Sequence, residues 1–321
     1  MRTPSRSEIR AALAEYAGMA AALGGLVAIF SLLTRHFFSL TTFRTIANQI
    51  PAAIVIATGM TLVLIIAEID LSVGSVLGLC SAFLGVVLVQ LHWPLWGAIG
   101  ATLAVGAASG TFNGLVSARW RLPSFIVTLG MLEMARGGAH FLTHSQTEYI
   151  GSRIEGLANT SVLGLSLPFL LALLVVLAGQ LTLSRTVLGR YLVAIGTNEE
   201  AVRLSGIDPR PIKVLVFLLT GVLVAVAAVI DTSRFQSANP NAGTGFELQA
   251  IAAVVIGGTS LMGGRGSVVS SFFGVLIIAV LNTGLAAVGA RDETKRLMTG
   301  LVILAAVILD HYRSRLGKLK D

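Results

Sequence analysis

The chain of 321 residues is 55% apolar and only 12% charged, and its mean hydropathy is +0.84. A water-soluble protein of this size has about 25% charged residues, so the composition excludes an ordinary soluble globular domain. The net charge of +7 comes from basic residues in loops between long apolar runs, which indicates contact with anionic membrane lipid and excludes a nucleic-acid partner.

The N-terminal segment has two interpretations. Arg2, Arg6 and Arg10 precede an apolar stretch over 17–33, as in a secretory signal peptide. No small-residue cleavage site closes this stretch, which ends at the polar residues 34–36. We therefore expect a retained first helix.

The rest of the chain alternates apolar runs with polar loops. A helix needs about 20 residues to cross the roughly 30 Å hydrocarbon core. Ten spans are predicted, at 16–33, 46–67, 73–91, 95–117, 125–142, 160–183, 214–231, 248–262, 267–289 and 295–310. Three of them, 125–142, 248–262 and 295–310, are short enough to be broken or re-entrant. We expect an all-α polytopic membrane protein whose residues 1–321 form a single transmembrane domain, with 16–310 spanning the membrane.

The distribution of Lys and Arg predicts the orientation of these spans. With the N-terminus inside and ten alternating spans, fifteen basic residues lie inside and seven outside. The inside group includes both termini and the largest cytoplasmic loop, 184–213. Because cytoplasmic loops are enriched in Lys and Arg, the sequence predicts that both termini are cytoplasmic.

A polar break separates the second and third predicted spans. Asp70 is followed by Ser72, Gly74 and Ser75. In one interpretation Asp70 caps the next helix by accepting backbone N–H bonds from its first residues. In the other, the hydroxyl groups and exposed backbone of the break line a solute pathway. The two interpretations are compatible. An acid–base pair of Asp70 with Glu68 is unsupported, because no nucleophile or electrophile lies nearby in the sequence.

The fifth predicted span contains two opposite charges three residues apart. Glu133 and Arg136 share one helix face, so we expect a structural ion pair, with a role in a solute pathway as the alternative. The five histidines are scattered without metal-ligand spacing, and Cys80 is the only cysteine, so we expect no metal site.

The cytoplasmic loop contains a short predicted helix with defined ends. Thr197 and Glu200 have capping-box spacing, and Glu199 adds a second acid to the first turn. Gly206 suits the left-handed position after the helix, and Pro209 prevents its continuation. So short a helix needs packing to be stable. It is either an ordinary loop helix on its own neighbours or a docking element for a cytoplasmic partner.

Two further segments, 232–247 and 257–266, are rich in turn-forming residues and in glycine, respectively. The external loop 232–247 is rich in turn formers and is either a plain connection or part of an external gate. The segment 257–266 is rich in glycine but lacks the Walker sequence G-x-x-x-x-G-K-[ST], as does the rest of the chain. We interpret it as close helix packing at an interrupted helix.

The short helix also resembles a known signature. Glu200-Ala201-Val202-x-x-x-Gly206 is similar to the Glu-Ala-Ala-x-x-x-Gly sequence that permeases of ATP-binding-cassette (ABC) importers present to their ATPase subunits. Order and spacing over roughly 45–310 resemble the ribose, xylose and arabinose branch of these permeases. The segments that match are 68–75, 122–130, 136–137, 198–207, 237–248 and 250–261.

The resemblance implies a monosaccharide (pentose or hexose) importer permease of a bacterial inner membrane, with no catalytic residues and no cofactor bound directly. It implies an ABC ATPase subunit that uses ATP, an extracytoplasmic sugar-binding protein and a second permease copy as partners. The implied ATPase-coupling residues are Thr197, Asn198, Glu199, Glu200, Ala201, Arg203, Leu204 and Gly206. The residues expected along the translocation pathway are Asp70, Ser72, Gly74, Ser75, Asn239, Thr244 and Glu247. The alternative is an ion-coupled secondary transporter of a small polar solute, which would use ionisable groups inside the membrane.

Overall fold

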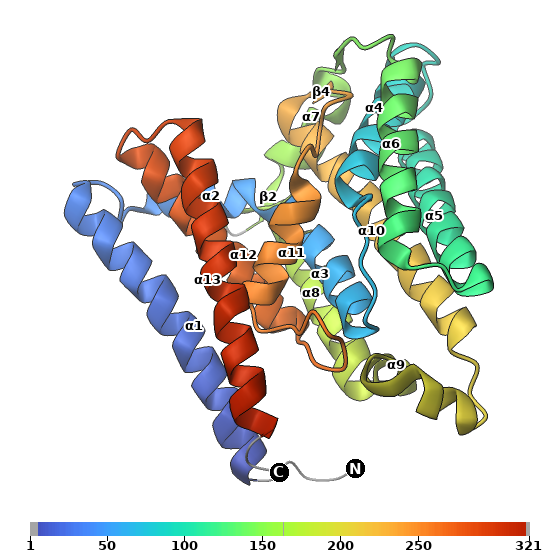
Figure 1. Cartoon of the computed structure of the whole chain (residues 1–321). Coiled ribbons are helices and arrows are strands. Elements are labelled where there is room, and N and C mark those ends of the chain that lie inside the picture. Colours follow the sequence, from blue (N-terminus) through green and yellow to red (C-terminus); the bar gives the residue numbers. More distant parts are fainter. Residues whose placement is uncertain (1–5, 163, 319–321) are drawn as a thin grey trace.

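The computed structural model describes residues 6–162 and 164–318, and this part of the chain is almost entirely helical (Figure 1). Of the basic residues counted for the topology, Arg2 and Lys320 lie outside the described residues. The N-terminal apolar stretch is helical, in α1 (Arg6–Leu33), as expected for a first helix.

The remaining helices follow in chain order. They are α2 (Leu40–Gln49), α3 (Pro51–Ile65), α4 (Val73–Val89), α5 (Leu95–Trp120), α6 (Ser124–Leu142), α7 (Ser152–Asn159), α8 (Leu167–Arg185), α9 (Val187–Leu204), α10 (Pro209–Phe235), α11 (Phe246–Ile256), α12 (Val268–Ala287) and α13 (Asp292–Lys318). Four two-residue strands form two antiparallel pairs: β1 (Glu148–Tyr149) with β4 (Ser237–Ala238), and β2 (Ser161–Val162) with β3 (Leu165–Ser166).

Helix length and apolarity support a polytopic membrane protein. Among the described helices, five are long and apolar enough to cross a membrane, and α2 with α3 makes a sixth if the bent pair is one span. The α4 and α11 helices are apolar but shorter than a full crossing. Helix length alone therefore supports fewer spans than the ten predicted.

Three predicted spans differ from the helices in their details. The span at 46–67 is two helices bent by 50°, because Pro51 begins a new helix after Ile50. The span at 160–183 begins later, at Leu167, since a β-hairpin occupies the preceding residues. The span at 248–262 is an 11-residue helix followed by irregular chain, which confirms a broken element there. The spans at 125–142 and 295–310 lie in continuous helices, so the suggestion of a break in them is wrong.

The hydrophobic core is centred on α3, which contacts α8, α9, α10, α11 and α12. Its side chains are almost all buried, including Ile54, Val55 and Met60. Beside it, α5 packs against α10 through small residues: a Cβ at Gly110 would overlap the backbone of Phe217. Such close backbone approach stabilises helix pairs where lipid removes the hydrophobic driving force between helices.

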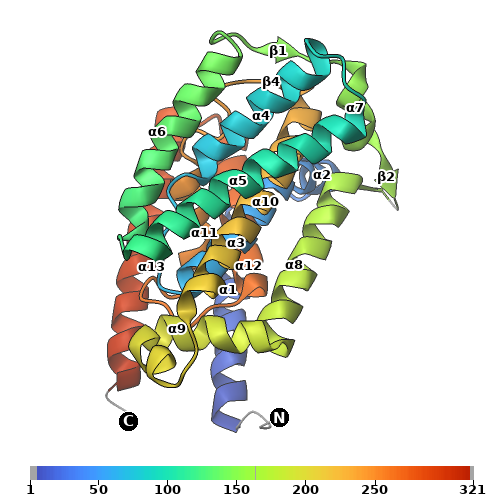
Figure 2. The same cartoon turned by 90° about the vertical axis from the view of Figure 1, so that its right-hand side faces the viewer.

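The two ends of the molecule are built differently. The α9 helix lies at the same end as the first described turn of α1 and the last of α13 (Figures 1 and 2). The opposite end holds α7 and the β1–β4 pair, which joins the loop after α6 to the loop after α10.

Candidate functional site

The second half of α9 is a separate short helix with well-defined ends. Asn198 has non-helical backbone angles (φ −161°, ψ 95°), and its Oδ1 accepts the N–H of Ala201 at 2.9 Å. Asn198 is therefore the N-cap. The predicted capping box is wrong by one residue, because the Thr197 hydroxyl donates to Val193 O within the preceding helix. Glu200 instead pairs with Arg203 at 2.6 Å.

The C-terminal end of this short helix matches the prediction. Gly206 has a φ of +90°, where a side chain would be strained. The N–H of Gly206 bonds to Arg203 O and that of Ile207 to Val202 O, which together form a Schellman motif. The chain then turns at Asp208, which caps α10 through the N–H of Arg210.

The short helix presents most of its surface to solvent. All eight predicted coupling residues are exposed, while Val202 is buried against the protein. Leu204 is 79% exposed among the charged side chains of this helix, so the surface offers an apolar contact beside its charges.

A groove of about 720 Å³ runs beside this helix. One wall is the turn between α5 and α6, and the other is the segment from Glu199 to Lys213. Its lining has four acidic and four basic residues, which are Glu68, Glu199, Glu200, Asp208, Arg121, Arg203, Arg210 and Lys213. The groove therefore has the size and the mixed polarity to hold a polar segment of a partner.

Lys213 links the short helix to the membrane-embedded part of the chain. Its Nζ lies 2.6 Å from Glu199 on the short helix and 2.6 Å from Glu68, which follows α3. The Lys213 and Glu68 side chains are only 12% and 13% exposed, whereas that of Glu199 is 48% exposed. A charge that is mostly removed from water needs its partners, so Lys213 depends on both carboxylates.

The glycine-rich segment adds backbone contact at the same place. The N–H of Gly264 donates to Ile65 O at 2.9 Å, where α3 ends. A Cβ at Gly196, in the first half of α9, would overlap the backbone of Ile65 and Gly264. The close packing predicted for 257–266 is thus confirmed, and it holds α9 against the end of α3.

The polar break between α3 and α4 is a network of buried hydrogen bonds. Asp70 Oδ1 accepts from the N–H of Ser72 at 2.9 Å and from its hydroxyl at 2.6 Å. The Asn113 amide on α5 donates to Ser72 Oγ at 3.0 Å. Asp70 therefore makes the predicted bond to the N–H of Ser72, but Ser72 is the N-cap of α4, so Asp70 holds the turn before the helix and does not cap it. Ser75, one turn into α4, is also buried.

Two hydroxyl groups of α6 hold the backbone of the break. The N–H of Ile69 donates to Ser124 Oγ at 2.9 Å, and that of Leu71 donates to Thr128 Oγ1 at 3.1 Å. Irregular backbone inside a membrane protein is stable only when other groups satisfy its hydrogen bonds. These contacts therefore explain how the chain tolerates a non-helical segment here.

The loop 237–247 is anchored from the opposite side by Arg136 of α6. Its guanidinium donates to Pro240 O at 2.6 Å and to Ala242 O at 3.0 Å. No ion pair joins it to Glu133 within the part of the chain that the structure describes, so the predicted pairing is not formed. The sequence could not identify the carbonyl acceptors, which lie more than a hundred residues away.

The same loop touches the first turn of α4. A Cβ at Gly74 would overlap Glu247 Oε2 and Gly243 O, so only glycine allows this approach. Gly74 and Glu247, both predicted for the pathway, are thus brought together. Asn239 and Thr244 lie on exposed parts of the loop, where Asn239 Oδ1 accepts the N–H of Asn241.

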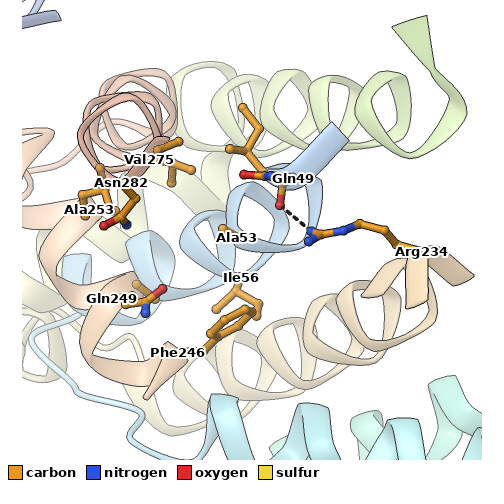
Figure 3. A pocket seen from close by; sticks show the side chains of 13 residues that line it. Gln49, Ala53, Ile56, Arg234, Phe246, Gln249, Ala253, Val275 and Asn282 are labelled. Carbon is orange, nitrogen blue, oxygen red and sulfur yellow. Dashed lines mark hydrogen bonds between the residues drawn. The ribbon is translucent and has the colours of Figure 1, made fainter. Parts of the chain in front are cut away.

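A separate cavity of about 230 Å³ lies among α2, α3, α10, α11 and α12 (Figure 3). The polar residues in its lining are Gln49, Arg234, Gln249 and Asn282, and Phe246 contributes an aromatic ring. None of the predicted pathway residues lines it. The sequence shows each amide separately, at the edge of or within an apolar run, and it does not show that they line one space.

Comparisons with known proteins agree with the resemblance. The family described as "Branched-chain amino acid transport system / permease component" matches residues 42–307. The chain is 40% identical over 293 residues to the ribose import permease protein RbsC of Escherichia coli K12, covering 89% of this chain and 90% of that protein. It is 34% identical over 299 residues to the fructose import permease protein FrcC of Rhizobium meliloti, covering 89% and 82%.

A third relative is the autoinducer 2 import system permease protein LsrC of Enterobacter sp. 638, which is 34% identical over 299 residues that cover 93% of this chain and 86% of that protein. No solved structure matches the chain at a significant level. The matched region contains every helix from α3 to α12. It also contains the irregular segments between α3 and α4 and between α11 and α12. The chain therefore belongs to this family of transport-system permease components, as a multi-pass transport protein of the bacterial inner membrane.

Proposed function

We propose that the chain is the permease subunit of an ABC importer that carries a monosaccharide, of the pentose or hexose class, across the inner membrane. The observation that supports this most is the exposed, capped helix over 198–206 in a chain whose relatives are named ribose, fructose and autoinducer 2 import permeases. A neutral sugar suits a chain whose buried polar groups are mostly hydroxyls and amides.

The proposed topology has ten spans with both termini in the cytoplasm. The spans are α1, the bent pair α2–α3, α4, α5, α6, α8, α10, α11, α12 and α13. The first described turn of α1, the last of α13 and the whole of α9 lie at one end of the molecule, which supports a common cytoplasmic side (Figure 1). The excess of basic residues on that side supports the same orientation.

In this proposal a separate ATPase subunit docks on the short helix and hydrolyses the ATP. The permease itself binds no cofactor. Leu204 supplies an apolar contact, and the groove of about 720 Å³ receives a segment of the partner. A partner that binds one conformation of the permease more tightly than the other shifts the balance between them, so ATP-dependent docking drives alternating access.

Lys213 transmits movement of the short helix over 198–206, the docking helix of this proposal, to the membrane domain. It holds Glu199 on that helix and Glu68 beside the α3–α4 break. A displacement of the helix therefore pulls on the segment that continues into Asp70 and Ser72, whose hydrogen bonds reach α5.

The other proposed partners are an extracytoplasmic binding protein, a second copy of the permease and anionic membrane lipid. The external end, where β1 pairs with β4, receives an extracytoplasmic sugar-binding protein. A second copy of the permease completes the transporter, and anionic lipid contacts the basic cytoplasmic loops.

Purification of the tagged chain in mild detergent, with mass spectrometry of its partners, tests the function. We expect a stoichiometric ABC ATPase that is lost in Glu200→Lys and Gly206→Val. Matched controls on α7 are Glu155→Lys at a half-buried position and Gly156→Val at an exposed one, and both should retain it. A chain without an ATPase that still takes up solute along an ion gradient would contradict the proposal and establish the secondary transporter.

A further inference from the structure

The cavity among α2, α3, α10, α11 and α12 combines an apolar floor with a polar rim. Its floor consists of aliphatic side chains, including Ile56, Val275 and Ile278. The amides of Gln49, Gln249 and Asn282 come from three different helices and line the same space (Figure 3). Amides that come together from distant parts of the sequence indicate a shared polar ligand.

Two of these amides make no side-chain hydrogen bond within the described part of the chain. The side chains of Gln49 and Gln249 are exposed, and neither makes a hydrogen bond with a described residue. Asn282 accepts only a long bond of 3.4 Å from Thr299. Unsatisfied amide groups facing lipid are costly, so this space is filled with water or a polar solute.

The charge of the lining restricts the solute. Arg234 is the only charged residue among the residues that line the cavity, and no acid is present. Its guanidinium donates one hydrogen bond, to Gln49 O at 3.2 Å, and lies 4.5 Å from the centre of the Phe235 ring, so its other N–H groups can donate to a hydroxyl group. A cation meets repulsion here, and an amino acid finds no carboxylate for its ammonium group. A neutral solute with many hydroxyl groups fits the donors and acceptors that remain.

The size and the aromatic group agree with this ligand class. The volume of about 230 Å³ lies just below the roughly 300 to 1,000 Å³ of sites for larger ligands. The ring of Phe246 and the aliphatic floor offer apolar contact to the C–H faces of a sugar ring, while the amides bind its hydroxyl groups.

We propose that this cavity is a binding site for a single monosaccharide within the permease, with Gln49, Gln249 and Asn282 as its hydrogen-bonding residues. The proposal rests on the proposed function, and it places the sugar beside the bend between α2 and α3. Phe246 and Gln249 both lie in the first turn of α11, which follows the loop 237–245.

Cysteine labelling of the full-length chain in native membrane vesicles tests the site. The background is Cys80→Ala, which removes the only cysteine. Ala53→Cys and Ala279→Cys, which line the cavity without supplying a hydrogen-bonding group, are treated with a membrane-impermeant anionic methanethiosulfonate. Leu174→Cys, exposed in the middle of α8, is the lipid-facing control. We expect fast labelling of the two cavity positions and at least tenfold slower labelling of the control.

Protection by solute identifies the ligand. We expect D-ribose to slow labelling of both cavity positions several-fold and L-leucine to leave it unchanged. Adding Gln249→Leu should raise the D-ribose concentration for half-protection of Ala279→Cys by about tenfold, as loss of one hydrogen bond predicts. Protection by L-leucine alone, or labelling as slow as at Leu174→Cys, overturns the site.

These outcomes are separable from those of the proposed function. ATP-driven D-ribose uptake without protection at either position would contradict the site and leave the importer function intact. Protection by D-ribose in a chain that neither retains an ATPase nor transports with ATP would support the site and contradict the importer.

Discussion

The chain has two anchored irregular segments, and a basic side chain holds each of them by a different interaction. Beside the short helix over 198–206, Lys213 holds Glu68 and Glu199 through charge; the first carboxylate is mostly buried and the second is half exposed. Beside the first turn of α4, Arg136 holds Pro240 and Ala242 through neutral backbone carbonyls, next to a glycine contact that admits no side chain. The half-exposed Glu199 can exchange Lys213 for water, whereas close backbone packing fixes one geometry. The comparison indicates a movable joint between Lys213 and Glu199 and a rigid contact between α4 and the loop 237–247.

The largest effect is expected from breaking the rigid contact. In Gly74→Ala the added methyl group meets Gly243 O and Glu247 Oε2, and the backbone carbonyl cannot move aside easily. Overpacking of this kind costs about 1 to 3 kcal/mol. We expect a lower melting temperature in detergent and loss of solute uptake.

The matched control for this change is Gly130→Ala on α6, where an added Cβ meets nothing within 4 Å. It should melt like the unmodified chain or slightly higher, since alanine favours helix. Equal melting temperatures for Gly74→Ala and Gly130→Ala would contradict the rigid contact.

A smaller loss is expected from removing the charge at the Lys213 joint. Lys213→Met leaves the mostly buried Glu68 without its partner. The expected cost is about 1 to 2 kcal/mol, above the value for exposed pairs and below that for fully buried pairs. Chemical unfolding monitored by circular dichroism measures it. The control Lys295→Met removes the exposed i,i+3 pair with Asp292 and should cost less than about 0.5 kcal/mol. Equal costs for the two variants would show that the Lys213 pairs are surface pairs.

The smallest effect concerns which residue is the N-cap of the docking helix. Asn198→Ala removes the N-cap bond to Ala201 and should cost about 1 kcal/mol locally, whereas Thr197→Ala removes only a bond to Val193 O and should cost less. Amide hydrogen exchange over residues 199–206 detects the difference. Faster exchange in Thr197→Ala than in Asn198→Ala would restore the capping box that the sequence predicted.

Local sequence patterns predicted much of the fold. The apolar runs located the long apolar helices, five or six of which can cross a membrane among the described residues, and Gly206 and Pro209 correctly marked the end of the docking helix. The N-cap was predicted one residue too early, because Thr197 and Asn198 are both good N-cap residues. The first half of α9 packs against the end of α3, and Thr197 belongs to that first half. The bend at Ile50 was missed even though Pro51 marks it.

Contacts between distant residues were beyond the sequence. Arg136 looked like a partner for Glu133 because the two are neighbours on one helix, but the fold brings carbonyl groups of a distant loop within its reach. Lys213 was counted only as a basic loop residue, since nothing in the sequence places it beside Glu68. The cavity escaped notice for the same reason, because Gln49, Gln249 and Asn282 meet only after three helices have packed.

The movable joint is tested most directly by D-ribose uptake and ATP hydrolysis measured together in liposomes that hold the chain with its co-purified partners. Glu199→Gln separates the docking helix from Lys213 while leaving the Lys213–Glu68 pair, and Glu155→Gln on α7 is the control. We expect normal ATPase binding and hydrolysis in Glu199→Gln, with several-fold less sugar transported per ATP, and an unchanged ratio in the control. An unchanged ratio in Glu199→Gln would contradict the joint, and uptake that needs no ATP would contradict the importer itself.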